Sequence, residues 1–351
     1  MGRRMGASLL SILVVGGIVY GQQAQRVEIR DVPDASRVDV LIGGKPFTSY
    51  VYARDQKKPT LFPLRSAQGT VVTRGYPVEP RANERADHPH HIGLWFNYGD
   101  VNGLDFWNNS DAIGPDRAPR MGTVVHSRVV RTEGGADKGE LQVEMQWVDS
   151  KGTALLREQT TFVFRGDDRS RAIDRITRLS ALDQPVLLGD NKEGLIGIRV
   201  ARWLEQPSKS PVVLTDGSGK PQAKTVNNDG VTGEYVGSDG KRGDDVWGTR
   251  GPWTMLGGKT GDEEVTLAIL DHPSNPGFPT YWHARGYGLF AANNLGQQAF
   301  DPKQPATKLA LAPGESVMFR HRVLILNGAP DAERMRAEHQ KFAAQAVQSQ
   351  N

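Results

Sequence analysis

The sequence predicts an all-β protein, a large antiparallel β-sandwich that ends in one C-terminal helix. Many short segments alternate apolar and polar residues, and clusters of turn residues separate them. The 40 glycines and 21 prolines suit long loops on such a scaffold. Short strands divided by turns are typical of sandwiches and barrels, whereas parallel sheets need helical crossovers between their strands.

The first 24 residues are expected to be an export signal. Arg3 and Arg4 supply the positive start, and an apolar stretch follows over residues 9–20. This stretch is too short for a bilayer span, which takes roughly 20 residues, although an uncleaved anchor is the alternative. We therefore expect an exported protein, periplasmic or extracellular, with a single mature domain over residues 25–351.

Hairpins account for the first half of that domain. A strand over residues 38–42 is expected to turn at Gly43 and Gly44 into a strand over residues 47–52. A second hairpin is predicted around the turn at residues 134–135. The other expected strands cover residues 124–131, 141–148, 160–164, 172–177, 265–270, 288–292 and 317–326.

The remaining elements are one helix and one long surface segment. Asp331 can begin a helix over residues 331–348, in which Met335, His339 and Phe342 recur at helical spacing. Residues 205–251 are polar and rich in glycine, and Trp247 near their end indicates that this segment folds back over apolar surface.

Composition excludes several classes of function. Cysteine is absent, so disulfides and thiol chemistry play no part. The formal net charge is +3 and no basic cluster stands out, which argues against a nucleic-acid partner. No segment after residue 24 is long and apolar enough to cross a membrane. The sequence has no G-x-S-x-G or H-E-x-x-H motif and no glycine-rich phosphate loop.

The densest chemical pattern is Asp87-His88-Pro89-His90-His91, which holds three of the eight histidines. If this stretch is extended, His88 and His90 face one way and His91 faces the other. Neutral imidazole accepts a proton or binds a metal near neutral pH. The alternative is that one or more of these histidines are hydrogen-bonded structural residues.

Two nearby tryptophans and one aspartate extend this pattern. Trp95 lies in a predicted buried strand, and Trp107 follows Asp105 in a polar loop. Asp105 can orient an imidazole by accepting its N–H, and a tryptophan can stack on a sugar ring. An ordinary polar loop with a packed tryptophan is the alternative.

Glu193 stands between a loop and a strand-like run, where its carboxylate is expected to be partly desolvated. Desolvation raises the proton affinity of a carboxylate, as a general acid or base requires. A surface ion pair between Lys192 and Glu193 is the alternative.

A fourth candidate stretch is aromatic. His283 follows Tyr281 and Trp282, and Arg285 comes two residues later. Aromatic walls with one imidazole and one guanidinium suit a polyol or an anionic sugar. An aromatic-rich core strand is the alternative.

Taken together, these stretches resemble a family of exported bacterial proteins labelled methane oxygenase PmoA-like, or left as a domain of unknown function. The resemblance covers roughly residues 37–326. Its motifs lie in residues 73–77, 87–96, 103–107, 192–201 and 279–293. Ile92 departs from the arginine expected in most members. The label is not taken literally, because a chain without membrane spans cannot adopt the fold of the membrane subunit so named.

That resemblance implies a carbohydrate role. A second resemblance, at the level of the fold, is to the galactose-mutarotase supersandwich, whose members use a histidine and a glutamate on an open sheet face.

The first hypothesis is an enzyme with epimerase-, lyase- or hydrolase-like acid/base chemistry on a sugar or keto-sugar. The expected catalytic residues are His90, His91, Glu193 and His283. The expected substrate-binding residues are Arg74, His88, Trp95, Asp105, Trp107, Trp282 and Arg285.

Two other hypotheses remain open. His88, His90 and His283 can supply nitrogens to a divalent metal, with Glu193 or Asp105 as a fourth ligand. Alternatively, the protein binds a small-molecule carbohydrate without catalysis. All three hypotheses require the distant stretches to meet around one hollow.

Overall fold

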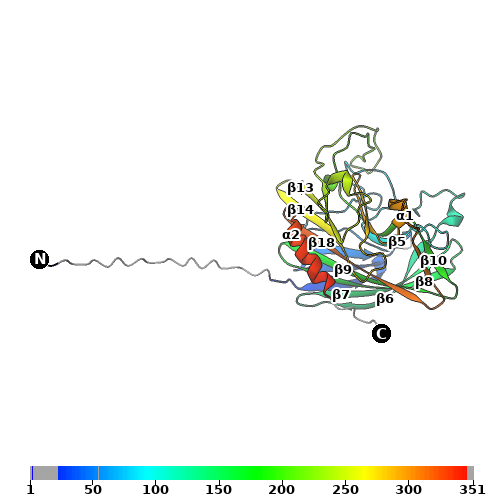
Figure 1. The fold of residues 1–351 in the computed structure, drawn as a ribbon. Helices are drawn as coiled ribbons and strands as arrows, with labels where there is room; N and C mark the ends of the chain where they lie inside the picture. The colour runs from blue at the N-terminus through cyan, green and yellow to red at the C-terminus, as the bar shows by residue number, and fades with distance from the viewer. Residues whose placement is uncertain (1, 3–22, 54, 346–351) are drawn as a thin grey trace.

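Two eight-stranded antiparallel sheets pack face to face in the computed structural model, which describes residues 2, 23–53 and 55–345 (Figure 1). Strands make up 45% of the chain and helices 9%. This confirms the predicted all-β class with its C-terminal helix. The predicted signal peptide over residues 1–24 falls almost wholly outside the described residues. Within the described ranges, no helix has the length and apolarity that a membrane crossing requires.

The first sheet carries the candidate site. Its strand order is β1-β2-β3-β4-β5-β11-β16-β15. In that order the strands are β1 (Val27–Val32), β2 (Arg37–Ile42), β3 (Lys45–Val51), β4 (Thr60–Leu61), β5 (Leu94–Tyr98), β11 (Gly194–Arg199), β16 (Leu289–Asn293) and β15 (Tyr281–Arg285).

The second sheet has the strand order β12-β13-β14-β18-β9-β8-β7-β6. These strands are β12 (Glu234–Gly237), β13 (Trp253–Thr260), β14 (Glu263–Asp271), β18 (Ser316–Asn327), β9 (Ser170–Ala181), β8 (Ala154–Gly166), β7 (Gly139–Val148) and β6 (Thr123–Glu133). The short elements are β10 (Val186–Gly189), β17 (Lys308–Leu311), α1 (Gln297–Phe300), η1 (Pro33–Ala35), η2 (Ala118–Arg120), η3 (Arg202–Leu204) and η4 (Gly243–Val246).

The predicted hairpins form where alternation and glycine turns placed them. Strands β2 and β3 pair across Gly43 and Gly44, both of which have positive φ, a conformation that glycine adopts without steric cost. In β7, Leu141, Val143 and Met145 are buried while their sequence neighbours are not. This period of two gives each strand one face for the core and one for the outside.

The main core lies between the two sheets. The ring of Phe96 in β5 lies 6.3 Å from the indole of Trp147 and 5.9 Å from the ring of Phe319, both in the second sheet. Burial of such large aromatic side chains is the main source of stability for a sandwich.

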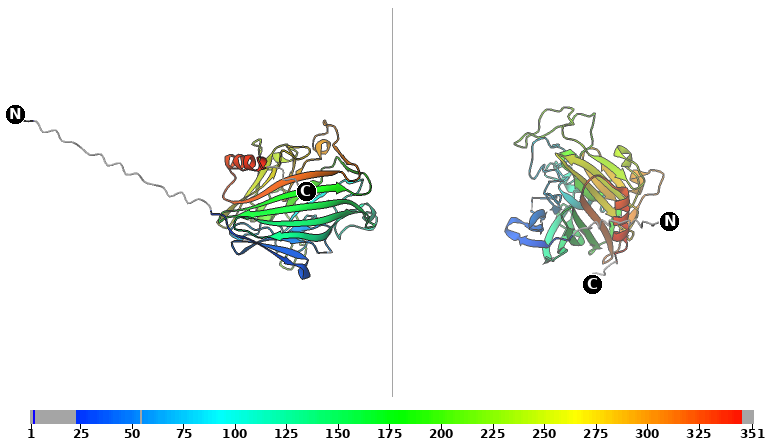
Figure 2. Two further views of the ribbon diagram at one scale, coloured as in Figure 1. Left: turned by 90° about the horizontal axis from the view of Figure 1, so that it is seen from below. Right: turned by 90° about the vertical axis from the view of Figure 1, so that its left-hand side faces the viewer.

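Helix α2 (Ala332–Ala343) covers the outer face of the second sheet (Figure 2). The Asp331 side chain caps it by accepting from the backbone N–H groups of Glu333 and Arg334. Met335 and Phe342 pack against the sheet, as their spacing predicted. The helix ends at Ala343, short of the predicted residue 348, and residues 346–351 are not described.

One ion pair lies inside the sandwich. Glu158 is fully buried and accepts from Trp147 Nε1 at 2.7 Å, from Thr160 and from Arg175. The guanidinium of Arg175 lies 4.8 Å from the Phe96 ring, at the centre of the interface between the sheets. Local patterning gave no indication of this pair.

Replacing Arg175 by Met should lower the free energy of unfolding by about 3–5 kcal/mol, because it leaves the Glu158 charge buried without a partner. Urea denaturation measures this change. The matched control is Arg128→Met, which removes the partner of Glu144 from an exposed pair and should cost less than about 1 kcal/mol. Equal effects of the two substitutions would contradict this account.

Candidate functional site

The candidate site lies on the outer face of the first sheet, opposite the face that meets the core. A cross-strand row joins Trp95, Gly197, Ala291 and His283, from β5 through β11 and β16 to β15. Their sequence neighbours, including Phe96 and Trp282, belong to the core between the sheets. Alternation along each strand therefore brings residues from three distant segments onto one surface.

Small residues at the centre of this row leave room for neighbouring side chains above the sheet. A Cβ at Gly197 would lie 2.7 Å from the Trp95 indole and 3.0 Å from the Trp107 indole. The two indoles thus pack over the glycine, and with Leu289 and Ala291 they form a separate apolar cluster. Glycine at residue 197 is required by this close packing rather than by a turn.

The His88–His91 segment is a turn, so the expectation of an extended segment was wrong. His88 has a φ of +42°, and the His91 N–H donates to the His88 carbonyl at 3.0 Å. The imidazoles of His88 and His91 therefore stack with centroids 5.0 Å apart. His91 lies on the same side as the other two histidines, not on the opposite side.

Four rings form a continuous stack across this turn. The His88 ring lies 4.9 Å from the Tyr287 ring, and the His91 ring lies 5.1 Å from the Trp95 ring. His90 contacts His91 edge-on at 4.3 Å. The stack connects the β15–β16 turn, which carries Tyr287, to strand β5.

Arg74 holds the turn in place. Its guanidinium donates to the carbonyls of Arg85, Asp87, His88 and His91, and to the Asp87 carboxylate at 2.8 Å. The side chain is 1% exposed. The predicted substrate-binding role of Arg74 is therefore replaced by a positioning role, because four of these five hydrogen bonds go to backbone carbonyls.

Arg199 fixes the protonation of His91. It donates to Asp87 Oδ1 at 2.5 Å and lies 3.3 Å from His91 Nδ1. A guanidinium only donates, so His91 Nδ1 accepts and the ring proton sits on Nε2. Burial lowers the pKa of His91 well below its ordinary value, and the neighbouring His90 and Arg199 lower it further. His91 is thus a neutral hydrogen-bond donor.

Asp87 stays ionised beneath this turn. Burial alone would raise the pKa of its carboxyl, but the charge of Arg199 and the contacts with His88 and Arg74 outweigh burial and hold the pKa well below its usual range.

Glu193 and His283 occupy the opposite end of the row. His283 Nδ1 lies 3.1 Å from the Lys192 carbonyl and 3.7 Å from Glu193 Oε2. Because a carbonyl only accepts, Nδ1 carries the proton and Nε2 offers a lone pair. Burial lowers the pKa of His283 to about 3, and the charges of Arg285 and Lys192 add to the effect.

Burial raises the pKa of the Glu193 carboxyl. Lys192 opposes the shift by its charge and its hydrogen bond, with its Nζ 3.3 Å from Glu193 Oε1. His88 acts electrostatically on both Glu193 and His283, and Asp105 acts on Glu193. The His88–His91 turn and the Glu193–His283 pair therefore lie within electrostatic range of each other.

An exposed aromatic wall borders this pair. Trp247 is 36% exposed and lies edge-on to His283 at 6.5 Å. The Arg285 guanidinium lies 5.6 Å from the Trp247 ring and 5.9 Å from the Tyr287 ring. Trp247, Arg285 and Tyr287, but neither Glu193 nor His283, line a hollow of about 680 Å³ together with Ser208. The sequence patterns did not identify Trp247 and Tyr287 as site residues, although Trp247 lies near the end of the glycine-rich segment over residues 205–251.

Four predicted substrate-binding residues have other positions or partners. Trp282 alternates with His283 on β15, so its indole packs in the core and not in the cleft. The Asp105 carboxylate accepts from the backbone and side chain of Asn108, at 2.9 and 2.8 Å, and not from an imidazole. Trp95 and Trp107 are fully buried, so neither offers a free ring face for sugar stacking.

The candidate metal ligands do not assemble. Among the residues that the structure describes, no three His, Cys, Asp or Glu side chains are grouped so as to hold a metal ion. His88 and His90 lie on the turn, while His283 lies across the row on β15 with its Nδ1 hydrogen-bonded to a carbonyl. The His88, His90 and His283 set is therefore not a ligand set in this structure.

Three buried nitrogens beside the turn lack an acceptor. Within residues 23–53 and 55–345, no partner contacts His91 Nε2, Trp95 Nε1 or Trp107 Nε1. Their rings contact one another, with centroids 5.0–5.8 Å apart. Buried N–H groups without partners are costly, so this cluster is suited to an acceptor oxygen from a ligand or a bound water.

These features define a class: a two-sheet antiparallel β-sandwich with a polar, histidine-bearing cleft on one outer sheet face. The chain belongs to a family of unknown function, DUF6807, which matches residues 37–340. This match overturns the resemblance to the PmoA-like methane oxygenase family, which nothing in the comparisons indicates. No curated protein matches the chain.

Solved structures with similar folds include a galactose mutarotase-like protein from Clostridium acetobutylicum. It is 9% identical with a TM-score of 0.36, and the match covers 87% of this chain and 99% of that one. A heparan sulfate lyase mutant from Pedobacter heparinus is 10% identical with a TM-score of 0.31, covering 84% and 34%. A glycoside hydrolase family 97 variant from Pseudoalteromonas sp. strain K8 is 10% identical with a TM-score of 0.30, covering 86% and 34%.

Replacing Gly197 by Ala should displace the indoles of Trp95 and Trp107 and lower the free energy of unfolding by about 1–3 kcal/mol. Near-ultraviolet circular dichroism should report the altered tryptophan packing, and urea denaturation the stability. Gly217→Ala is the control, because nothing lies within 4 Å of a Cβ at that residue. An unchanged tryptophan spectrum in Gly197→Ala would disprove the close packing described here.

Proposed function

We propose that the protein is an enzyme that acts on a carbohydrate by acid/base chemistry, with Glu193 as the group that transfers the proton. The observation that carries this proposal is the Glu193 carboxyl, whose pKa burial raises, lying 3.7 Å from a neutral imidazole that the half-exposed Trp247 ring contacts edge-on. Perturbed carboxyls in clefts are typical of general acids and bases.

The roles follow from the protonation states. A carboxyl with a raised pKa can take a proton from a substrate carbon or oxygen and return it. His283 is neutral at that pH, so its Nε2 lone pair can accept a hydrogen bond from a substrate hydroxyl. His91 carries its proton on Nε2, but that atom is buried, so the contact with substrate is left to Glu193 and His283.

The aromatic wall beside His283 suits a sugar. Pyranoses have an apolar C–H face, which packs against aromatic rings, and hydroxyls, which need charged or polar partners. Trp247 and Tyr287 supply the rings, and Arg285 supplies an exposed guanidinium between them. Because the cleft holds both kinds of group, a polyol ring satisfies it better than a purely apolar ligand does.

Two reactions match this arrangement. In the first, Glu193 removes the proton next to a carbonyl of a keto-sugar, and the electron pair of that C–H bond expels the glycosidic oxygen, which takes up a proton. In the second, the proton is returned to the opposite face of the same carbon, which gives an epimer. Both reactions begin with the same proton abstraction, so one measurement detects either.

Glu193→Gln should slow proton abstraction by at least about 10²-fold, because an amide cannot accept the proton. The measurement is proton NMR in D₂O with a panel of keto-glycosides, following loss of the signal next to the carbonyl. Exposed Glu264→Gln is the matched control and should keep the wild-type rate. Sugar binding without any exchange in the wild type would favour a non-catalytic binder, and full activity in Glu193→Gln would refute the assignment.

Lys192→Met should shift the acidic limb of the pH–rate profile to higher pH. Lys192 lowers the pKa of Glu193 by its charge and hydrogen bond, so its removal leaves burial unopposed and raises that pKa. The base form of Glu193 is then lost at a higher pH as the solution is acidified. The profile of exchange rate against pH measures the shift, and a limb that moves to lower pH would contradict the role of Glu193 as base.

A further inference from the structure

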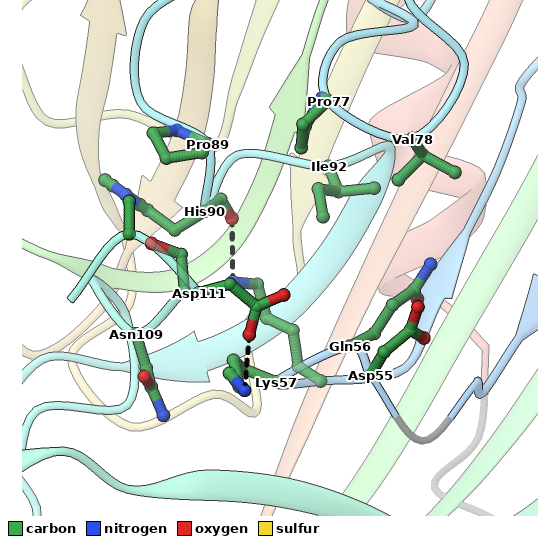
Figure 3. A pocket seen from close by; sticks show the side chains of 13 residues that line it. Asp55, Gln56, Lys57, Pro77, Val78, Pro89, His90, Ile92, Asn109 and Asp111 are labelled. Carbon is green, nitrogen blue, oxygen red and sulfur yellow. Dashed lines mark hydrogen bonds and ion pairs between the residues drawn. The ribbon is translucent and has the colours of Figure 1, made fainter. Parts of the chain in front are cut away.

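A second hollow lies beside His90 (Figure 3), and it shares no lining residue with the hollow at Trp247. Its volume is about 330 Å³, and its lining includes Lys57, Lys58, His90, Ile92 and Asp111. This volume is at the lower end of the range for ligand pockets, so it fits one small ring rather than a chain of several.

The hollow contains a buried cation without a counter-ion. Lys58 is 3% exposed, and its Nζ donates to the His90 carbonyl at 2.7 Å and lies 5.6 Å from the Trp95 ring. Among the described residues, no carboxylate lies within the 4.0 Å ion-pair distance of this Nζ. Burial lowers the pKa of Lys58 to about 7, and Asp105 opposes that shift from beyond contact.

The acidic residues of the hollow do not supply the missing charge. Asp111 pairs with Lys57 at 2.6 Å, and its side chain is 75% exposed. Asp55 is exposed as well. Solvent screens charges at such a rim, whereas the buried ammonium is screened much less. An anion that enters the hollow therefore meets rim carboxylates that solvent screens, and a buried ammonium at Lys58 that it does not.

We infer that this hollow binds the carboxylate of an acidic sugar, with Lys58 as its partner. An ammonium group has three donors, of which the His90 carbonyl takes one, so further donors are available to the two carboxylate oxygens. The choice of a sugar as the anion rests on the proposed function. The substrate class inferred is therefore the uronic acids.

The hollow lies beside the His88–His91 turn, because Lys58 donates to the His90 carbonyl and its Nζ lies 5.6 Å from the Trp95 ring on the outer face of the sheet. Asp105 acts electrostatically on both Lys58 and Glu193, and His88 acts on both His90 and Glu193. A ring whose carboxylate lies at Lys58 is thus bound next to the His88–His91 turn and on the same side of the sheet as the proton-transfer group.

The test compares D-glucuronate with D-glucose, which differ by a carboxylate in place of a hydroxymethyl group. Isothermal titration of the full chain at pH 6, where Lys58 is mostly charged, should show glucuronate binding at least about ten-fold more tightly, the gain expected of a charged hydrogen-bonded pair. Lys58→Met should abolish that difference and leave the affinity for glucose within about two-fold. Exposed Lys151→Met is the control and should bind both sugars as the wild type does.

Stability gives an independent readout. Lys58→Met should unfold at the same or a higher temperature than the wild type, because it removes a buried charge that lacks a partner. Glucuronate should raise the melting temperature of the wild type but not of Lys58→Met. Lys58→Gln, which keeps a polar group, gives the same comparison where the methionine variant does not fold.

Two results would overturn the inference: equal binding of the two sugars by the wild type, or undiminished glucuronate binding by Lys58→Met. Glu193→Gln separates it from the proposed function. If glucuronate binding depends on Lys58 while proton exchange survives Glu193→Gln, the proposed function fails alone. If Glu193→Gln abolishes exchange while Lys58→Met binds glucuronate normally, only the acidic-sugar assignment fails.

Discussion

Two buried guanidinium groups converge on one carboxylate, that of Asp87, and the rest of the site depends on this contact. Arg74 and Arg199 both donate to Asp87 Oδ1, from a loop and from the end of β11 respectively. Arg74 also holds the carbonyls of the turn, while Arg199 sets the tautomer of His91 and lies 5.0 Å from the Tyr287 ring. Loss of the carboxylate would leave two like charges facing each other in a buried place.

Three of the histidines in this site, His90, His91 and His283, are neutral near neutral pH. Burial and the nearby guanidinium groups lower the pKa of His90, His91 and His283. Under the proposed function the carboxyl of Glu193 transfers the proton, while the partners of His91 and His283 fix their tautomers. A cluster of histidines in a sequence suggests acid/base catalysis, but the surrounding charges decide which side chain performs it.

Local patterns predicted the strands, since alternation and glycine turns are encoded within each hairpin. They did not predict which face of a strand meets the core: Trp282 and His283 are neighbours, and only the pairing of β15 with β16 decides that His283 faces the cleft. The role of Arg74 was missed because its partners are backbone carbonyls, which leave no trace in the sequence. Lys58 was missed because it stands alone, without a motif.

The alternation on β15 and β11 has a consequence for how such proteins diverge. Inserting one residue into either strand would turn the side chains of the outer face toward the core and those of the core toward the outer face. The packing between the two sheets would then be lost. The segment that carries Trp247 lies outside the strands, and its neighbours in residues 205–251 are mostly exposed or irregular. Changes of length there leave the sheets intact, so a relative can acquire a different ligand range by remodelling one loop while the side chains on the sheet face stay the same.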